Sequence, residues 1–136
     1  TLDNGHAWEK FKSLVSAQGG DVNYVIDPQR LPSASFNKTF FAPKGGYISE
    51  INARKVGEAA VMLGAGRTKK DDSIDYGVGV ITHCKVGDRI EIDQPLFTIY
   101  ANRETELYQV GEFLLNAYQL SDSPVKPLPL FYEVVK

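Results

Sequence analysis

The sequence predicts an α+β fold with three main helices and several short strands. Apolar residues recur at helical spacing in three stretches, residues 7–15, 53–63 and 107–118. Short runs rich in β-branched and aromatic residues, such as 36–42 and 90–99, are broken by glycine and proline and predict strands. Because helices and strands do not alternate regularly, a doubly wound parallel sheet is not expected.

Size and charge fit one globular domain. The chain has 136 residues, 43% of them hydrophobic, and can bury roughly two-thirds of its unfolded surface. A net charge of -2 favours neither nucleic acid nor an anionic membrane as a partner. No apolar run approaches the ~20 residues that span a bilayer, and no leader pattern is seen, so a cytoplasmic protein is expected. The single cysteine, Cys84, excludes an internal disulfide and suits that compartment.

The N-terminal residues predict a helix followed by a loop. Asp3 or Asn4 can cap the first free amides, and Gly19 with Gly20 can end the helix. Its apolar stripe includes Trp8, which we interpret as a packing residue and not as a ligand contact. The prolines that follow predict a loop up to about residue 35.

The next elements predict a hairpin-like pair of strands and a central helix. Residues 36–42 and 47–51 read as strands joined by a turn at 43–46. The helix that follows has an apolar face and ends where Gly64 and Gly66 can close it. That face contains Ala53, Val56, Ala60 and Leu63.

A charged loop and further strands complete the pattern. Residues 67–73 lack apolar periodicity and predict a loop, and 74–81 alternates as a strand. After a turn at 85–88, two strands are expected on either side of residues 93–95. A helix over 104–120, with Leu107, Val110, Leu114 and Ala117 or Tyr118 on one face, precedes a final strand over 130–135.

The glycines after the central helix allow three interpretations. Gly64, Gly66 and Arg67 are residue types that can hold a phosphate, but phosphate-binding glycine loops follow a strand and open a helix. Here the glycines close a helix, which favours a plain helix cap. The third interpretation is a mobile loop over residues 64–73 that moves against a neighbouring domain.

Acidic residues in and after this loop do not predict a metal site. Asp71, Asp72 and Asp75 lack the spacing of a calcium loop. Because Lys69 and Lys70 precede them, a solvated mixed-charge loop is favoured. At the start of the predicted strand, Asp75 is able to accept hydrogen bonds from backbone amides.

No catalytic pair is predicted from the histidines and the cysteine. His83 and Cys84 are adjacent on a predicted strand, so their side chains point to opposite faces. His6, the other histidine, lies near a helix start. Neither a catalytic triad nor a histidine metal site can be assembled, and we predict no catalytic, substrate-binding or metal-binding residue.

Several strings resemble the C-terminal domain of pyrimidine-nucleoside phosphorylases and thymidine phosphorylases. They include LGAGR at 63–67, the acidic run that follows it, and GVG at 77–79. Flanking similarity at 7–21, 42–57 and 85–102 extends the likeness over roughly residues 5–135 in one register. The resemblance implies an α/β-hammerhead with a small mixed or antiparallel half-barrel sheet, related to barrel-sandwich hybrids such as biotinyl and lipoyl domains.

The resemblance also implies a place in a longer enzyme. Residues 1–136 would form its C-terminal domain, with an N-terminal helix at 1–20, the hammerhead and half-barrel core at 36–102, and a helix and final strand at 104–135. The enzyme would be a homodimeric pentosyltransferase that uses phosphate as co-substrate and binds potassium. Partners would be the N-terminal helical and phosphate-binding domains of the same enzyme, whose absence would expose an apolar patch.

No residue of this sequence matches the family's phosphate, base or potassium contacts. The isolated chain is therefore expected to be inactive and to serve a structural role. The resemblance implies a cleft-closing loop, formed by Gly64, Gly66, Arg67, Lys69, Lys70, Asp71 and Asp72.

Two functions other than the phosphorylase would also use a half-barrel of this kind. A lipoyl or biotinyl carrier needs a lysine at a hairpin tip, and residues 100–104 contain none, so this function is disfavoured. The remaining alternative is a free-standing, noncatalytic binding module on the same half-barrel.

Overall fold

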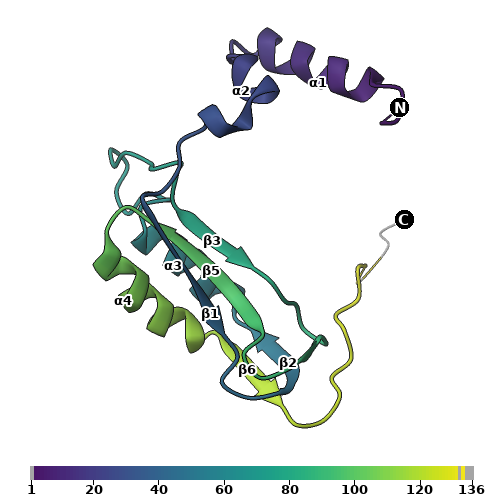
Figure 1. The fold of residues 1–136 in the computed structure, drawn as a ribbon, viewed down its shortest axis with the longest axis vertical. Helices are drawn as coiled ribbons and strands as arrows, with labels where there is room; N and C mark the ends of the chain where they lie inside the picture. The colour runs from purple at the N-terminus through teal and green to yellow at the C-terminus, as the bar shows by residue number, and fades with distance from the viewer. Residues whose placement is uncertain (1, 132, 134–136) are drawn as a thin grey trace. The chain divides into compact units, whose positions relative to one another are not determined.

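The computed structural model describes residues 2–131 and 133 (Figure 1). The chain divides into two compact units, Thr1–Pro32 and Ser33–Lys136. Their described residues contain four α-helices, one short 3-10 helix and two small antiparallel sheets, which confirms the predicted α+β class.

The first unit contains α1 (His6–Ala17), α2 (Asn23–Ile26) and η1 (Pro28–Arg30). Helix α1 begins later than predicted, because left-handed Gly5 (φ 75°) takes the cap position and Asn4 accepts the His6 N–H at 3.1 Å. The predicted loop after α1 is wrong in detail, since it contains α2 and η1. The η1 turn is stabilised by Asp27, whose carboxylate accepts the Gln29 N–H, and by Pro28, whose ring fixes φ.

The apolar stripe of α1 is largely exposed. Trp8, Phe11 and Leu14 are 45%, 48% and 52% exposed, and no residue of α1 is buried. The rings of Trp8 and Phe11 lie 6.3 Å apart between centroids. Within residues 2–32 the stripe therefore stays about half exposed, and the packing role of Trp8 stays a prediction.

The second unit contains two three-stranded antiparallel sheets. One has the order β1 (Phe36–Phe41), β5 (Pro95–Ala101), β3 (Gly79–Thr82), and the other the order β4 (Arg89–Ile90), β2 (Gly46–Ile51), β6 (Tyr118–Ser121). Within the described part of the chain, neither sheet closes into a barrel.

The predicted hairpin of the first two strands is wrong, because β1 and β2 belong to different sheets. After β1 the chain pairs with the turn before β5: the Ala42 N–H donates to the Gln94 carbonyl at 2.9 Å. Gly46 then allows β2 to approach β6 closely, since a Cβ there would lie 2.8 Å from the Ser121 carbonyl oxygen. The turn and its glycines therefore carry the chain from one sheet to the other.

Helix α3 (Ala53–Met62) begins at an asparagine cap and ends where the glycines predicted. The Asn52 carboxamide oxygen accepts the Lys55 N–H at 3.1 Å at its start. At its end Gly64 is left-handed (φ 97°), with Gly64 N–H donating to the Val61 carbonyl and Ala65 N–H to the Ala60 carbonyl. This pair of bonds is a Schellman motif, and it confirms the helix cap predicted from the glycines.

Helix α4 (Glu104–Leu115) is shorter than predicted, and residues from Tyr118 onward form β6. The Asn116 side chain donates to the Glu112 carbonyl at 2.9 Å, and the Ala117 N–H donates to the Leu114 carbonyl at 2.8 Å, which ends the helix.

Two of the predicted strands differ from those in the structure. The strand expected over 74–81 starts only at Gly79. Of the strand expected over 130–135, residues 130, 131 and 133 form none, and the rest lies outside the described residues.

The core of the second unit lies between the sheets and the helices. Helix α4 packs on β1 and β5, and α3 packs on α4 and β3 (Figure 1). Phe97 of β5 is fully buried, with its ring centroid 5.0 Å from Phe40 and 5.3 Å from Tyr118. Since Tyr118 belongs to β6, this stack of three rings joins the two sheets. Gly111 lets α4 approach β1, because a Cβ there would overlap the Phe40 ring.

The hydroxyl of Tyr118 is buried and has no hydrogen-bond partner among the described atoms. Burial also raises the pKa of this phenol above its ordinary value. Because an unpaired buried hydroxyl is destabilising, we predict that Tyr118→Phe increases the free energy of unfolding by about 1 kcal/mol. Urea denaturation checks this, and a decrease of that size would show that the hydroxyl has a stabilising partner.

Candidate functional site

The loop over residues 64–73 connects α3 to the segment before β3. It begins at the Schellman motif of α3, and the Asp75 N–H donates to the Gly64 carbonyl at 2.9 Å. The two ends of the loop therefore lie side by side, and the residues between them form a single projecting loop.

The loop contains its own hydrogen-bonded turn. The Asp72 carboxylate accepts from the Thr68 hydroxyl, from the Thr68 N–H at 3.1 Å and from the Lys69 N–H at 2.8 Å. These bonds, that of the Thr68 side chain first, lower the pKa of Asp72 below its ordinary value. The turn is therefore fully favoured above the ordinary carboxyl pKa and is lost as the pH falls through the lowered one.

We predict that Asp72→Ala accelerates amide hydrogen exchange at Thr68 and Lys69, because both amides lose their acceptor. Nearby Asp71, which is exposed, gives the matched control Asp71→Ala. The measurement is residue-resolved exchange by NMR. Equal protection in Asp72→Ala and in the unmutated chain would show that the turn does not depend on the carboxylate.

Three basic side chains lie on the exposed surface of the loop, next to the exposed Asp71. Arg67, Lys69 and Lys70 are exposed, and none takes part in the ion pairs found among the described residues. Gly66 packs closely on α3, where a Cβ would lie 2.7 Å from a Val61 methyl group. The residues predicted for the loop thus form an exposed, mixed-charge segment with a fixed base, and their role in closing a cleft stays a prediction.

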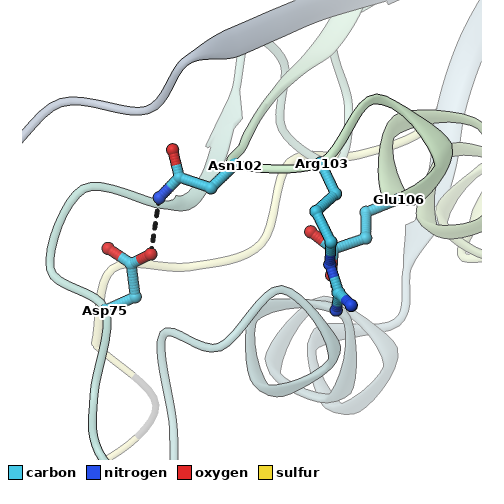
Figure 2. Close-up of polar contacts among 4 residues, drawn as sticks. All are labelled: Asp75, Asn102, Arg103 and Glu106. Carbon is cyan, nitrogen blue, oxygen red and sulfur yellow. Dashed lines mark hydrogen bonds and ion pairs between the residues drawn. The ribbon is translucent and has the colours of Figure 1, made fainter.

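The base of the loop is tied to the strands by Asp75 and Asn102, whose side chains point toward each other in Figure 2. The Asn102 Nδ2 donates to Asp75 Oδ2 at 2.6 Å, and Asp75 Oδ1 accepts the Gly77 N–H at 2.9 Å. The second bond confirms the prediction that Asp75 binds backbone amides. Asn102 was not predicted, because it lies 27 residues from Asp75 in the sequence.

Arg103, the residue just before α4, forms a separate ion pair with Glu106 in the first turn of the helix, away from Asp75 (Figure 2). This pair was not predicted, although a basic and an acidic residue three positions apart at a helix start are a recognisable signal.

His83 and Cys84 have unrelated surroundings. His83 Nε2 lies 2.8 Å from the Thr98 hydroxyl, which lies 2.8 Å from the Thr39 hydroxyl. The Cys84 thiol is buried and donates to the Leu96 carbonyl at 3.7 Å. Burial, with a smaller effect from Asp88, raises the pKa of this thiol to about 11. At neutral pH the thiol is protonated and is a poor nucleophile.

No group of three or more His, Cys, Asp or Glu side chains among the described residues is arranged to hold a metal ion. Among the same residues, no helix has the length and apolar character needed to cross a membrane.

The first unit carries an apolar groove of about 490 Å³. Its walls come from α1, α2 and the turns beside them, so it lies wholly within residues 1–32. The lining includes Trp8, Phe11, Val15, Tyr24, Val25 and Leu31. Exposed apolar surface gathered in this way is typical of a protein interaction site.

Comparison with known proteins identifies the family. The family described as pyrimidine nucleoside phosphorylase C-terminal domain matches residues 47–121, which include the loop, Asp75 and Asn102. The pyrimidine-nucleoside phosphorylase of Bacillus subtilis (strain 168) is 48% identical over 117 residues, which is 86% of this chain and 26% of that protein. That of Geobacillus stearothermophilus is 40% identical over 134 residues, 98% of this chain and 31% of that protein.

A third relative, the pyrimidine-nucleoside phosphorylase of Staphylococcus aureus (strain bovine RF122 / ET3-1), is 39% identical over 126 residues. Those residues make up 93% of this chain and 29% of that protein. The chain thus spans less than a third of the length of these three relatives. On the family match and these alignments, the chain belongs to the pyrimidine nucleoside phosphorylase C-terminal domain family.

Proposed function

We propose that this chain is the C-terminal domain of an enzyme that phosphorolyses pyrimidine nucleosides. In that reaction a phosphate oxygen forms a bond to C1′ of the pentose, the bond from C1′ to the base breaks, and base and pentose 1-phosphate are released. The observation that carries the proposal is the likeness to phosphorylases over 86% to 98% of this chain. The alternative, a free-standing binding module, is not favoured by these relatives.

The role proposed for the chain is structural. Phosphorolysis requires an anion to be held against the sugar in a cleft that excludes water. We assign the groups that contact phosphate, the base and potassium to the rest of the enzyme, in keeping with the resemblance. The isolated chain should therefore release no base.

The groove of the first unit supports an interaction with the rest of the enzyme. Trp8 and Phe11 line it and remain about half exposed. Covering these side chains removes apolar surface from water, at roughly 25 cal/mol per Å². We propose that the N-terminal helical and phosphate-binding domains of the same polypeptide cover this surface, in an enzyme that forms a homodimer.

Two further parts of the proposal concern the second unit. Its two antiparallel sheets, with α3 and α4 packed against one of them, are compatible with an α/β-hammerhead beside a half-barrel. The loop of Gly64, Gly66, Arg67, Lys69, Lys70, Asp71 and Asp72 is proposed to help close the cleft. Its exposed tip and its hydrogen-bonded base support this role, since a closing loop needs fixed ends and an accessible tip.

A chimera tests the function. The C-terminal segment of the Geobacillus stearothermophilus relative that aligns with this chain would be replaced by this chain, and release of uracil from uridine and phosphate measured. We expect the chimera to release uracil, and neither this chain alone nor the relative lacking that segment to do so. A folded but inactive chimera would contradict the proposed function. Uracil release by this chain alone would contradict the structural role.

A further inference from the structure

Asn102 contacts two segments that are far apart in the sequence. Its Nδ2 donates to Asp75 Oδ2 at 2.6 Å. Its Oδ1 accepts from the Ser35 N–H at 2.9 Å and from the Ser35 hydroxyl at 3.1 Å. One carboxamide therefore uses its donor on the segment that follows the loop and its acceptor on the segment that precedes β1.

Asp75 makes two further hydrogen bonds, one through its side chain and one through its backbone. Its second carboxylate oxygen accepts the Gly77 N–H, and its own N–H donates to the Gly64 carbonyl, each at 2.9 Å. Asp75 thus closes the base of the loop over residues 64–73 while its side chain holds Asn102.

The backbone at Gly77 also lies close to residues 33–34, which is independent evidence that the two segments are linked. A Cβ on Gly77 would lie 3.0 Å from the Ser33 carbonyl carbon and 3.2 Å from the Ser33 nitrogen. The backbone at residue 77 therefore packs directly on residues 33–34, which lie in the same compact unit. These residues follow the last residue of the Thr1–Pro32 unit along the chain.

We propose that Asp75 and Asn102 are positioning residues that couple the base of the loop to residues 33–35. Loss of their hydrogen bond frees the loop base and residues 33–35 together. The coupling itself does not depend on the proposed function. Its consequence for turnover does, because that consequence rests on the cleft-closing role of the loop.

A donor–acceptor exchange tests the coupling in the 136-residue chain. In Asn102→Asp two carboxylates oppose each other, so the hydrogen bond is lost. In the double variant Asp75→Asn with Asn102→Asp, the amide introduced at position 75 can donate to the carboxylate introduced at position 102, while Ser35 and Gly77 keep their acceptors. We expect Asn102→Asp to speed amide exchange about tenfold at residues 35, 75 and 77, and the double variant to return it to within about threefold of the original.

The ion pair of Arg103 and Glu106 provides the matched control. Glu106→Gln weakens a neighbouring polar contact that involves neither the loop nor residues 33–35, so exchange at Ser35 and Gly77 should not change. The coupling is overturned if Asn102→Asp speeds exchange at Asp75 and Gly77 but leaves Ser35 unchanged. It is also overturned if the double variant stays as fast as Asn102→Asp, since repair of the bond would then have no effect.

The same variants in the chimera separate this inference from the proposed function. With uridine and phosphate, Asn102→Asp should lower kcat about tenfold with little change in KM, and the double variant should restore it. An inactive parent chimera would refute the function while exchange still reports on the coupling. Coupled exchange with unchanged kcat in an active chimera would refute the role of the pair in positioning the loop for turnover.

Discussion

Phe97→Ala should lower the free energy of unfolding by about 3–5 kcal/mol, because it empties the centre of the second unit. Phe97 has no exposed surface, and its ring lies between those of Phe40 and Tyr118. Both of those contacts would be lost, and with them the aromatic link between the two sheets. Urea denaturation followed by circular dichroism measures the change. Since small domains are stable by only about 5–15 kcal/mol in total, the variant is expected to be partly unfolded at 37 °C.

Phe41→Ala is the matched control for this prediction. Phe41 lies at the end of β1 and is 50% exposed, so its removal should cost less than about 1 kcal/mol. Phe97→Leu should fall between the two, because it keeps most of the buried volume but loses the ring contacts. If Phe97→Ala were no more destabilising than Phe41→Ala, the stacked rings would not be the centre of the core.

Features of the fold that depend on one short stretch of sequence could be predicted. The Schellman motif at Gly64 followed from glycines placed after an apolar helical stretch. By contrast, Tyr118 and Leu120 fit either the end of a helix or a strand. Pairing of Ile51 with Tyr118, 67 positions later, decides in favour of the strand, and no local pattern contains that information.

In the candidate site, too, contacts between segments that are distant in sequence could not be predicted. The loop residues and the backbone bond of Asp75 could be predicted, because a charged run between a helix cap and a strand is a local signal. The bond from Asn102 to Asp75 and those from Ser35 to Asn102 depend on three segments meeting in space. The exposure of Trp8 could not be predicted either, since an apolar helical stripe has the same sequence pattern whether its packing partner lies within or outside the chain.

Replacing residues 67–73 by two glycines should lower kcat/KM of the chimera by on the order of 100-fold, with little effect on stability. If the loop closes the cleft as proposed, a shortened loop cannot complete that closure, and small errors in positioning reacting groups have effects of this size. Stability should be kept, since the Schellman motif at Gly64 and the bond from the Asp75 N–H to the Gly64 carbonyl both remain. Steady-state uracil release and urea denaturation measure the two properties.

A charge variant shows what the loop contributes beyond its length. Changing Arg67, Lys69 and Lys70 to glutamine keeps all ten residues of 64–73 and the Thr68–Asp72 bonds but removes the exposed cations. If closure alone matters, this variant should retain activity within about threefold, whereas an equal loss in both variants would assign the effect to charge. Unchanged kcat/KM in the shortened loop would refute a role in closure, because no part of the loop beyond its base would then be needed.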